Sequence, residues 1–426
     1  MDTITHGIVG ALVGKAFFAG GDVPAQMVDD ARDGAWNAVS NDAQSSTTAR
    51  VAILGCTIGS IFPDIDIFAG PIARNPLAIM EWHRNITHSI VVLPVWAGLL
   101  AALSLPLARW LHWKAPPFAK LFGIYAAGLA THVFLDIVTN FGTMVWSPLK
   151  YSRLAWDWVF ILDLTLTSIA LVPQLTAWCF REPEKFKRRA TAVWVALTLG
   201  ACGAYALAMT AGYGFPIGVL GIVSGLFALL LFVPAIHGTG FRWSRAAWCR
   251  GGFACLCAYL ACAAVMHGKA LADVSDFVIA HHLPAENRAA LALPPTFTHW
   301  AGLISTPEGV WRTTFHEPGG VIERTQLYSD AQSDRYVEEA KKLRDVQVYL
   351  WFARFPIWHV RQQEGQTIVE ISDVRFFREE EPDVNAESAR PARFAGIRTN
   401  SSGFTFEVVF NDHGQAISQG FKQPQP

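Results

Sequence analysis

The feature that most limits how this chain can fold is a series of apolar segments, each close to the length of a membrane span. A helix of about 20 apolar residues crosses the hydrocarbon core of a bilayer, which is about 30 Å thick. Six segments meet this length, at 88–110, 118–140, 158–178, 190–212, 215–236 and 245–268, and two weaker ones lie at 4–19 and 51–69. The sequence therefore predicts a mainly α-helical, polytopic membrane bundle of about eight helices.

The acidic residues divide the chain into two unlike parts. Of the 35 Asp and Glu residues, 14 lie in residues 1–270 and 21 in the shorter part, 271–426. Only 16% of all residues are charged, whereas soluble domains average about 25%. We expect a transmembrane domain over 1–270, a linker over 271–295 and a soluble domain over 296–426. The net charge of −1 argues against a nucleic-acid partner, which would need a basic surface.

The C-terminal part has the pattern of a small, β-rich α+β domain. Apolar and polar residues alternate in "VWRTTF", "GVIERTQLY", "TIVEISDVRFF" and "GFTFEVVF", as is typical of strands with one buried face. The segment "DRYVEEAKKLRDVQVYLWFARF" begins as an amphipathic helix. By contrast, residues 20–49 are polar with little periodicity, and we interpret them as a flexible insertion.

Basic residues in three short connections predict the orientation in the membrane. Arg and Lys concentrate at 109–120, 181–189 and 242–250, and the positive-inside rule places such connections in the cytoplasm. The uncharged connection 211–218 then lies outside, so the assignments alternate as consecutive spans require. If both weaker segments also cross, the C-terminal domain is extracytoplasmic. The alternative is that the first of them enters the membrane without crossing it.

His and Asp side chains gather at one predicted end of this bundle. The stretches "MDTITHG", "FPDID", "EWHRNITHSI", "ATHVFLDIVTN" and "AWDWVFILD" all fall at the outer ends of predicted helices. Ionisable groups in membrane segments are costly and are usually paired or functional. Six of the 14 acids before residue 270 lie in or beside these stretches: Asp64, Asp66, Glu81, Asp136, Asp157 and Asp163. We therefore expect a polar site at that end.

The spacing of these residues suits metal ligands. His132 and Asp136 are one helical turn apart, so both side chains point the same way. His83 and His88 diverge on an ideal helix. They converge if His83 lies in an entry loop and His88 in the first helical turn, with Asn85 as the N-cap.

Two further acids follow Pro63, where we expect the preceding helix to unwind. Of Asp64 and Asp66, one would bind a metal and the other would bind a second metal or orient a histidine. Either is also a candidate general base. Arg84 is a candidate for bidentate binding of phosphate oxygens and for stabilising oxyanion charge.

Imidazole and carboxylate ligands suit zinc, with manganese and iron as alternatives. Phosphoesterases commonly use metal pairs about 3.5–4 Å apart, and this ligand set is large enough for one to three ions. Taken singly, His6 has the ordinary interpretation of an interfacial residue, and Asp157 that of a charge favoured at a helix N-terminus. The candidate metal ligands are His6, Asp64, Asp66, His83, His88, His132 and Asp136.

These motifs, in this order and spacing over residues 1–180, resemble the YdjM-like family of bacterial inner-membrane proteins. Members are regarded as metal-dependent hydrolases, and some are LexA-regulated. Segments 373–377 ("DVRFF") and 406–415 ("FEVVFNDHGQ") resemble the longer members, and 20–49 is an insertion relative to the compact ones. The family looks distantly similar to zinc-dependent phospholipase C and P1 nuclease. The resemblance carries the family motifs onto the seven candidate ligands and Arg84.

We therefore expect a membrane-bound, metal-dependent hydrolase of the bacterial inner membrane. Its site would open at the extracytoplasmic face at headgroup depth, where a lipid phosphoester is the expected substrate and membrane lipids are the expected partners. The alternative is a divalent-cation or proton-coupled transporter, which would place acids deep in several helices and show an internal repeat. A third reading is a structural membrane protein with a vestigial site.

Overall fold

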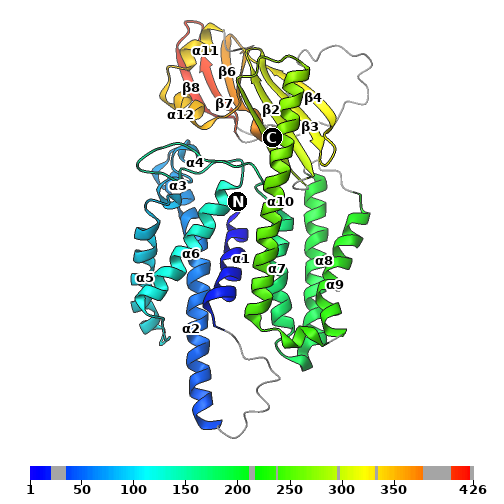
Figure 1. Ribbon diagram of the computed structural model, residues 1–426. Helices are drawn as coiled ribbons and strands as arrows, with labels where there is room; N and C mark the ends of the chain where they lie inside the picture. The colour runs from blue at the N-terminus through cyan, green and yellow to red at the C-terminus, as the bar shows by residue number, and fades with distance from the viewer. Residues whose placement is uncertain are drawn as a thin grey trace.

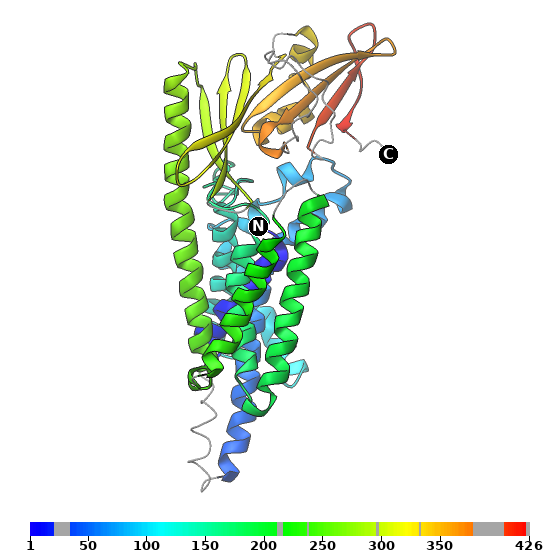
Figure 2. The ribbon, with the colours of Figure 1, turned by 90° about the vertical axis from the view of Figure 1, so that its right-hand side faces the viewer.

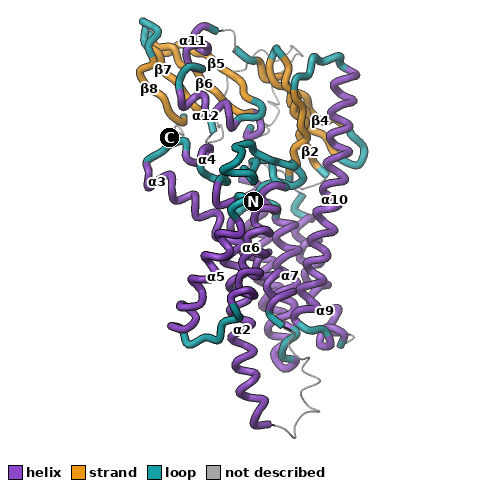
Figure 3. The backbone as a smooth tube through the Cα atoms, turned by 60° about the vertical axis from the view of Figure 1, so that its left-hand side comes forward, coloured by secondary structure: helices purple, strands orange, loops and turns teal. Residues whose placement is uncertain are grey.

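The computed structural model of the chain describes residues 1–20, 35–210, 216–236, 238–294, 298–331, 334–377 and 404–422. These residues form a helical bundle with two β-sheets at one end (Figures 1 and 3). The fold class is therefore the one that the sequence predicts.

The bundle contains eight main helices, counted over the described ranges. They are α1 (Thr3–Val13), α2 (Ala35–Ile61), α5 (Leu93–Trp110), α6 (Phe118–Ile137), α7 (Leu164–Cys179), α8 (Phe186–Thr210), α9 (Gly218–Ile236) and α10 (Arg245–Ala280). Shorter helical pieces join them: the π-helical turn η1 (Gly14–Phe18), the 3-10 turns η4 (Phe62–Phe68), η5 (Ile86–His88), η6 (Pro183–Lys185) and η7 (Thr239–Arg242), and the helices α3 (Ala69–Ala73) and α4 (Ala78–Glu81).

Six of the described helices are long and apolar enough to cross a membrane. Five are α5, α6, α8, α9 and α10, which overlap segments predicted as long spans, although α8 begins before its predicted segment and α10 continues well beyond its own. The sixth, Thr47–Ala73, consists of the later part of α2 with η4 and α3, and it includes the segment 51–69 that was predicted as weaker. Conversely, the predicted long span 158–178 overlaps only α7, a helix of 16 residues. Its first turn starts late because Asp163 accepts the backbone N–H groups of Thr165 and Leu166.

The three basic connections lie at the same end of the bundle. α5 meets α6, α7 meets α8, and α9 meets α10 at the end far from the sheets (Figures 1 and 2). The chain's first residues and the ends of α2, α6 and α10 lie at the opposite end, next to the sheets (Figure 1). This arrangement agrees with the alternation that the positive-inside argument requires.

Close packing of α1, α2 and α6 sets up the polar end of the bundle. A Cβ on Gly128 of α6 would lie 2.4 Å from the carbonyl oxygen of Cys56 and 2.9 Å from the nitrogen of Ser60. A Cβ on Gly10 of α1 would lie 2.5 Å from Ser60 Cβ. Only glycine permits these approaches, as in other closely packed membrane helices. One turn beyond Gly128, His132 is thereby held against α2.

The C-terminal domain consists of two four-stranded antiparallel sheets, each with its strands in chain order. The first has β1 (Asn287–Leu293), β2 (His299–Thr306), β3 (Gly309–His316) and β4 (Val321–Ser329). The second has β5 (Pro356–Gln363), β6 (Gln366–Asp373), β7 (Phe406–Phe410) and β8 (Ala416–Phe421). The four strand segments quoted from the sequence fall in β3, β4, β6 and β7. The predicted helix is two helices, α11 (Arg335–Ala340) and α12 (Arg344–Phe352), and η8 (Val374–Phe376) follows β6.

The region predicted as a linker, 271–295, is regular structure over its described residues, 271–294. It contains the last turns of α10 and all of β1. Val274 and Phe277 on α10 pack against Trp300 and Phe315 of the first sheet, so α10 continues beyond its apolar part to support that sheet. The Pro-rich appearance of the region concealed this amphipathic extension.

The predicted insertion, 20–49, is also partly helical. Residues 21–34 lie outside the described residues, whereas α2 begins at Ala35. The helix extends backwards because "AWNAVSNDAQSSTTAR" contains no Pro or Gly to end it.

The second sheet rests on the loops of the bundle. Leu77, Met80 and Phe141 of the membrane domain share one apolar core with Tyr349 and Phe352 of α12. At its edge, Arg354 forms a bidentate ion pair with Asp157 at 2.8 and 2.9 Å. The Asp157 carboxylate therefore links the two domains, a role that its interpretation as a helix N-terminal charge did not include.

We expect Arg354→Ala to destabilise the junction by about 1.5–3 kcal/mol, because it leaves the buried carboxylate of Asp157 without its charged donor. The thermal unfolding transition in detergent, read together with protease cleavage between the domains, measures this. The control is Arg344→Ala, because the Arg344 side chain is 71% exposed in its pair with Glu81 and such pairs contribute below about 1 kcal/mol. Equal melting temperatures for the two variants would contradict the prediction.

Candidate metal centre

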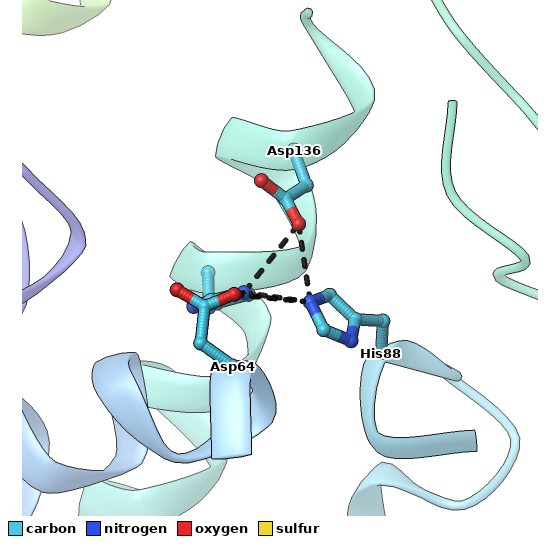
Figure 4. Close-up of side chains that lie close together, drawn as sticks. Asp64, His88 and Asp136 are labelled. Atoms are coloured by element: carbon cyan, nitrogen blue, oxygen red, sulfur yellow. Dashed lines mark hydrogen bonds and ion pairs between the residues drawn. The ribbon is translucent and has the colours of Figure 1, made fainter. Parts of the chain in front are cut away.

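Four side chains from three parts of the chain converge at the end of the bundle next to the sheets. Asp64 lies in η4, where α2 tightens into a 3-10 helix after Pro63, as the sequence predicts. His88 ends η5, and His132 and Asp136 occupy the last turns of α6. All four are buried and offer ligand atoms that lie within 4.8 Å of one another (Figure 4).

The distances within this group lie close to those of a tetrahedral metal site, and the two shortest are slightly below them. His88 Nε2 lies 3.0 Å from His132 Nε2, 3.2 Å from Asp136 Oδ2 and 3.6 Å from Asp64 Oδ1. His132 Nε2 lies 3.4 Å from Asp136 Oδ2 and 3.5 Å from Asp64 Oδ1. Bonds of about 2.0–2.2 Å from an ion to nitrogen or oxygen place tetrahedral ligands about 3.3–3.6 Å apart. These four residues can therefore hold one ion.

Both histidines present an unprotonated Nε2 to the group when they are neutral. His132 Nδ1 lies 2.7 Å from the carbonyl oxygen of Ser60, and His88 Nδ1 lies 3.2 Å from Asp66 Oδ2. A carbonyl and a carboxylate only accept hydrogen bonds, so the proton of each neutral ring sits on Nδ1. Such partners are typical of metal-binding histidines. Asp66 therefore lies where it can orient His88, which is one of the roles that the sequence left open for it.

The two oxygens of Asp136 have different surroundings: Oδ1 contacts cationic groups, and Oδ2 faces the candidate ligands. Oδ1 lies 2.5 Å from the α-amino group of Met1, 3.0 Å from Arg84 and 3.1 Å from His6 Nε2. Oδ2 is buried without a hydrogen-bond donor among the described residues, and it faces both histidine Nε2 atoms. A buried carboxylate oxygen without a donor is unfavourable unless a cation meets it.

The charge around His88 also favours a cation. Burial by itself lowers the pKa of His88, but its hydrogen bonds to Asp136, Asp64 and Asp66 outweigh burial and raise the pKa to about 10. Without a metal, a proton therefore satisfies the surrounding carboxylates. A metal ion would replace that proton, because a ligating imidazole must be neutral.

A second set, Asp66, His83 and His88, shares His88 with the first. His83 follows α4 and His88 ends η5, and both reach Asp66, so the two histidines converge as predicted. His88 lies in a 3-10 turn that precedes α5, however, and not in the first turn of that helix. Asn85 is not an N-cap, since its side chain makes no capping hydrogen bond. Its amide instead donates to the carbonyl oxygen of Glu81 at 3.1 Å.

His6 and Arg84 border the four-residue group. The His6 ring stacks on His132 at 3.7 Å, but His6 belongs to neither ligand set. Its assignment as a ligand stays a prediction. Arg84 is 2% exposed and adopts a positive φ of 61°. Its guanidinium contacts Asp136 and donates to Thr139 Oγ1 at 3.1 Å.

Asp163 has a structural role in addition to its position near the site. It caps α7 and accepts a hydrogen bond of 2.6 Å from Tyr259 of α10. Sequence reasoning missed the Ser60 carbonyl, the Met1 amine and Thr3, which donates to Asp64 Oδ2 at 2.5 Å. Backbone groups leave no residue-type signal, and Thr3 is an ordinary residue near a helix start.

Aromatic side chains connect the surroundings of the centre to the C-terminal domain. Phe141 lies between Arg84, whose guanidinium is 4.8 Å from the ring centroid, and Phe352 at 5.1 Å. On the side of the membrane domain, Arg153 donates to the carbonyl oxygen of His83 at 3.1 Å. Burial, with Arg84 and Arg375 nearby, lowers the pKa of Arg153 to about 9. The two domains therefore share the surroundings of the candidate centre.

The fold and these residues define a class of membrane protein with a polar end whose His and Asp side chains could hold a metal ion. The YdjM inner membrane protein family matches residues 1–215. This range is just over half of the 426 residues, and the chain belongs to that family. No curated protein and no solved structure was found to match the chain. The distant similarity to phospholipase C and P1 nuclease stays a prediction.

We expect His132→Ala and Asp136→Asn each to remove one metal ion per chain, because each deletes a ligand atom from the four-residue group. Even loss of a ligand's hydrogen-bond partner costs about 10–100-fold in metal affinity. Elemental analysis of protein purified in detergent measures the stoichiometry. The control is His112→Asn, because His112 is exposed in a distant connection and Asn tolerates its positive φ of 54°. Unchanged metal content in both ligand variants would exclude the site.

Proposed function

We propose that this protein is a membrane-bound, metal-dependent hydrolase of a lipid phosphoester. The observation that carries the proposal is the buried group of two imidazole nitrogens and two carboxylate oxygens within 4.8 Å of one another, in which Asp136 Oδ2 faces both nitrogens. A mixed His and Asp set favours zinc, and manganese or iron are the alternatives. Such an ion would supply Lewis-acid activation of water and of a phosphoryl oxygen.

The chain's own groups provide proton transfer beside the ligand set. His83 Nδ1 lies 2.7 Å from Asp66 Oδ1, so the carboxylate holds the ring with Nε2 directed away from it. The His83 side chain is 15% exposed, in contrast to the buried ligands. We assign the exchange of a proton with the reacting groups to this His83–Asp66 pair. Asp64, placed in the ligand set, is less suited to serve as the base.

Arg84 supplies positive charge next to the ligand set. Its guanidinium is neutralised only in part, because it shares Asp136 Oδ1 with Met1 and His6. Its Nε is buried without a hydrogen-bond partner among the described residues. A fixed, partly unpaired guanidinium in a dry site stabilises developing negative charge.

An apolar groove favours a lipid as the substrate. It has a volume of about 400 Å³ and is lined by Thr3, Ile4, Gly7, Ile8, Ala11, Ile61, Leu171 and Gln174. The groove lies between α1, α7 and the end of α2, and Thr3 connects it to Asp64 through a hydrogen bond. An acyl chain in this groove would bring its headgroup to the ligand set. The positive-inside argument places this end of the bundle at the extracytoplasmic face.

The transporter alternative requires a path of ionisable groups through the membrane. The ligand set instead follows α2 and ends α6, so it lies at the end of the bundle next to the sheets (Figure 1). No described feature favours transport over hydrolysis. Uptake of radiolabelled zinc into proteoliposomes distinguishes the two functions, and hydrolysis predicts none above the level of empty liposomes.

For the proposed hydrolysis, we expect His83→Gln to lower kcat by about 10²–10⁴-fold, because it removes the proton-exchanging group. It should leave the metal content of the buried group unchanged. His132→Ala should lose both activity and metal. Release of phosphorylated headgroups from mixed phospholipid vesicles, followed by mass spectrometry, measures the activity. A His83→Gln variant with full activity would remove His83 from the mechanism, and full activity in metal-free protein would refute the hydrolase proposal.

We also expect Gly7→Leu to impair lipid substrates selectively. A Cβ at Gly7 already lies 2.9 Å from Ile61 Cδ1, so a leucine side chain fills the groove. The variant should raise KM for long-chain lipids at least about tenfold, which corresponds to roughly 1.4 kcal/mol of lost binding. Hydrolysis of a water-soluble aryl phosphodiester should not change. The control is Gly98→Leu on α5, where an added Cβ meets no atom within 4 Å. Equal effects on both substrate types would argue against lipid entry through this groove.

A further inference from the structure

A second cluster of metal-binding side chains lies on the first sheet of the C-terminal domain, apart from the centre described above. It consists of His299, His316 and Glu323. His299 opens β2 and pairs in register with His316, the last residue of β3. Glu323 lies near the start of β4, the next strand. Three neighbouring strands therefore bring two imidazoles and a carboxylate together at one end of the sheet.

The three side chains bring their ligand atoms within 4.8 Å of one another. The two imidazole rings stack with centroids 4.7 Å apart and planes inclined by 21°. His316 Nε2 lies 3.1 Å from Glu323 Oε1, and His299 Nε2 lies 3.8 Å from Glu323 Oε2. Both Nε2 atoms thus face the same carboxylate. These separations bracket the spacing of about 3.3–3.6 Å expected between tetrahedral zinc ligands.

The backbone fixes the orientation of both rings. His299 Nδ1 lies 3.2 Å from the carbonyl oxygen of Pro294, and His316 Nδ1 lies 3.1 Å from that of Thr298. A carbonyl oxygen only accepts hydrogen bonds, so a neutral ring carries its proton on Nδ1 and directs a lone pair from Nε2 toward Glu323. Two lone pairs and a carboxylate facing one position form a cation site with the same backbone support that zinc-binding histidines usually have.

We propose that His299, His316 and Glu323 bind a zinc-class divalent ion with solvent at the remaining position. Two histidines and one glutamate form a known three-residue ligand set for zinc. His316 is 50% exposed and Glu323 is 48% exposed, so this ion exchanges with solvent more readily than one in the buried centre. The proposal does not depend on the hydrolase function.

The position of the cluster indicates a structural effect of the bound ion. It joins β2, β3 and β4 beyond their backbone hydrogen bonds. Glu317, adjacent to His316, pairs with Lys269 of α10 at 3.2 Å. An ion at this cluster would therefore fasten the ends of β2, β3 and β4 near the point where the sheet pairs with α10. Metal ligation at a site formed only by the folded strands stabilises the folded state.

The test is a zinc titration of the full-length protein in detergent, stripped with a chelator and monitored against a chromophoric competitor. The double variant His299→Ala/His316→Ala should bind one zinc ion fewer per chain than the wild type. It should keep the site that His132→Ala removes. Glu323→Gln changes only an exposed position on a strand, and it should weaken the exchangeable site by at least about 10–100-fold. His413→Ala, which removes an exposed histidine from another turn of the same domain, should bind zinc as the wild type does.

A second readout is the melting temperature. Zinc should raise it more in the wild type and in His413→Ala than in Glu323→Gln. Equal zinc stoichiometry and affinity in the wild type, the double variant and Glu323→Gln would overturn the proposal. A loss of zinc from the His413→Ala protein to the same extent would also overturn it.

Discussion

Three carboxylates share a small buried volume at the end of the bundle, and the need to neutralise them organises the surrounding structure. Asp64, Asp66 and Asp136 all lie within reach of His88. Charges taken out of water are tolerated only when paired. The chain meets this requirement with Arg84 and the Met1 amine on one side of Asp136. On the other side of Asp136, its second oxygen and the Asp64 carboxylate face the Nε2 atoms of His88 and His132, and a metal ion would fit among these four groups.

The C-terminal domain takes part in the same arrangement. Its aromatic side chains surround Phe141, and its Arg375 donates to the backbone carbonyl of Asn140 at 2.9 Å, just beyond the end of α6. The loops next to the candidate centre therefore lie between helices below and sheets above (Figure 3). The segment that carries His83 and His88 needs such support, since ligand geometry depends on rigid surroundings. The soluble domain is thus better understood as part of the site than as an attached module.

Much of the candidate site follows from local sequence rules. The spacing of His132 and Asp136 predicts that both lie on one face of α6. The position of Pro63 predicts that the helix changes near Asp64, where the structure has a 3-10 helix. The strands of the C-terminal domain were predicted where one face is buried. Other features depend on tertiary structure. The Ser60 carbonyl reaches His132 only because Gly128 lets two helices touch, and the pairing of His299 with His316 depends on strand register. The continuation of α10 was hidden because its apolar face packs on a sheet rather than in lipid.

The groove between α1 and α7 opens beside apolar helices, whereas the sheets cover the end of the bundle. A molecule that enters through it would arrive by diffusion in two dimensions. Its supply would then be set by its mole fraction in the leaflet and not by its concentration in bulk water. Diluting the substrate with inert lipid would slow turnover even at constant total substrate. After cleavage, the two products would part by solubility: the phosphorylated headgroup into water, and the acyl portion back into the bilayer from which it came.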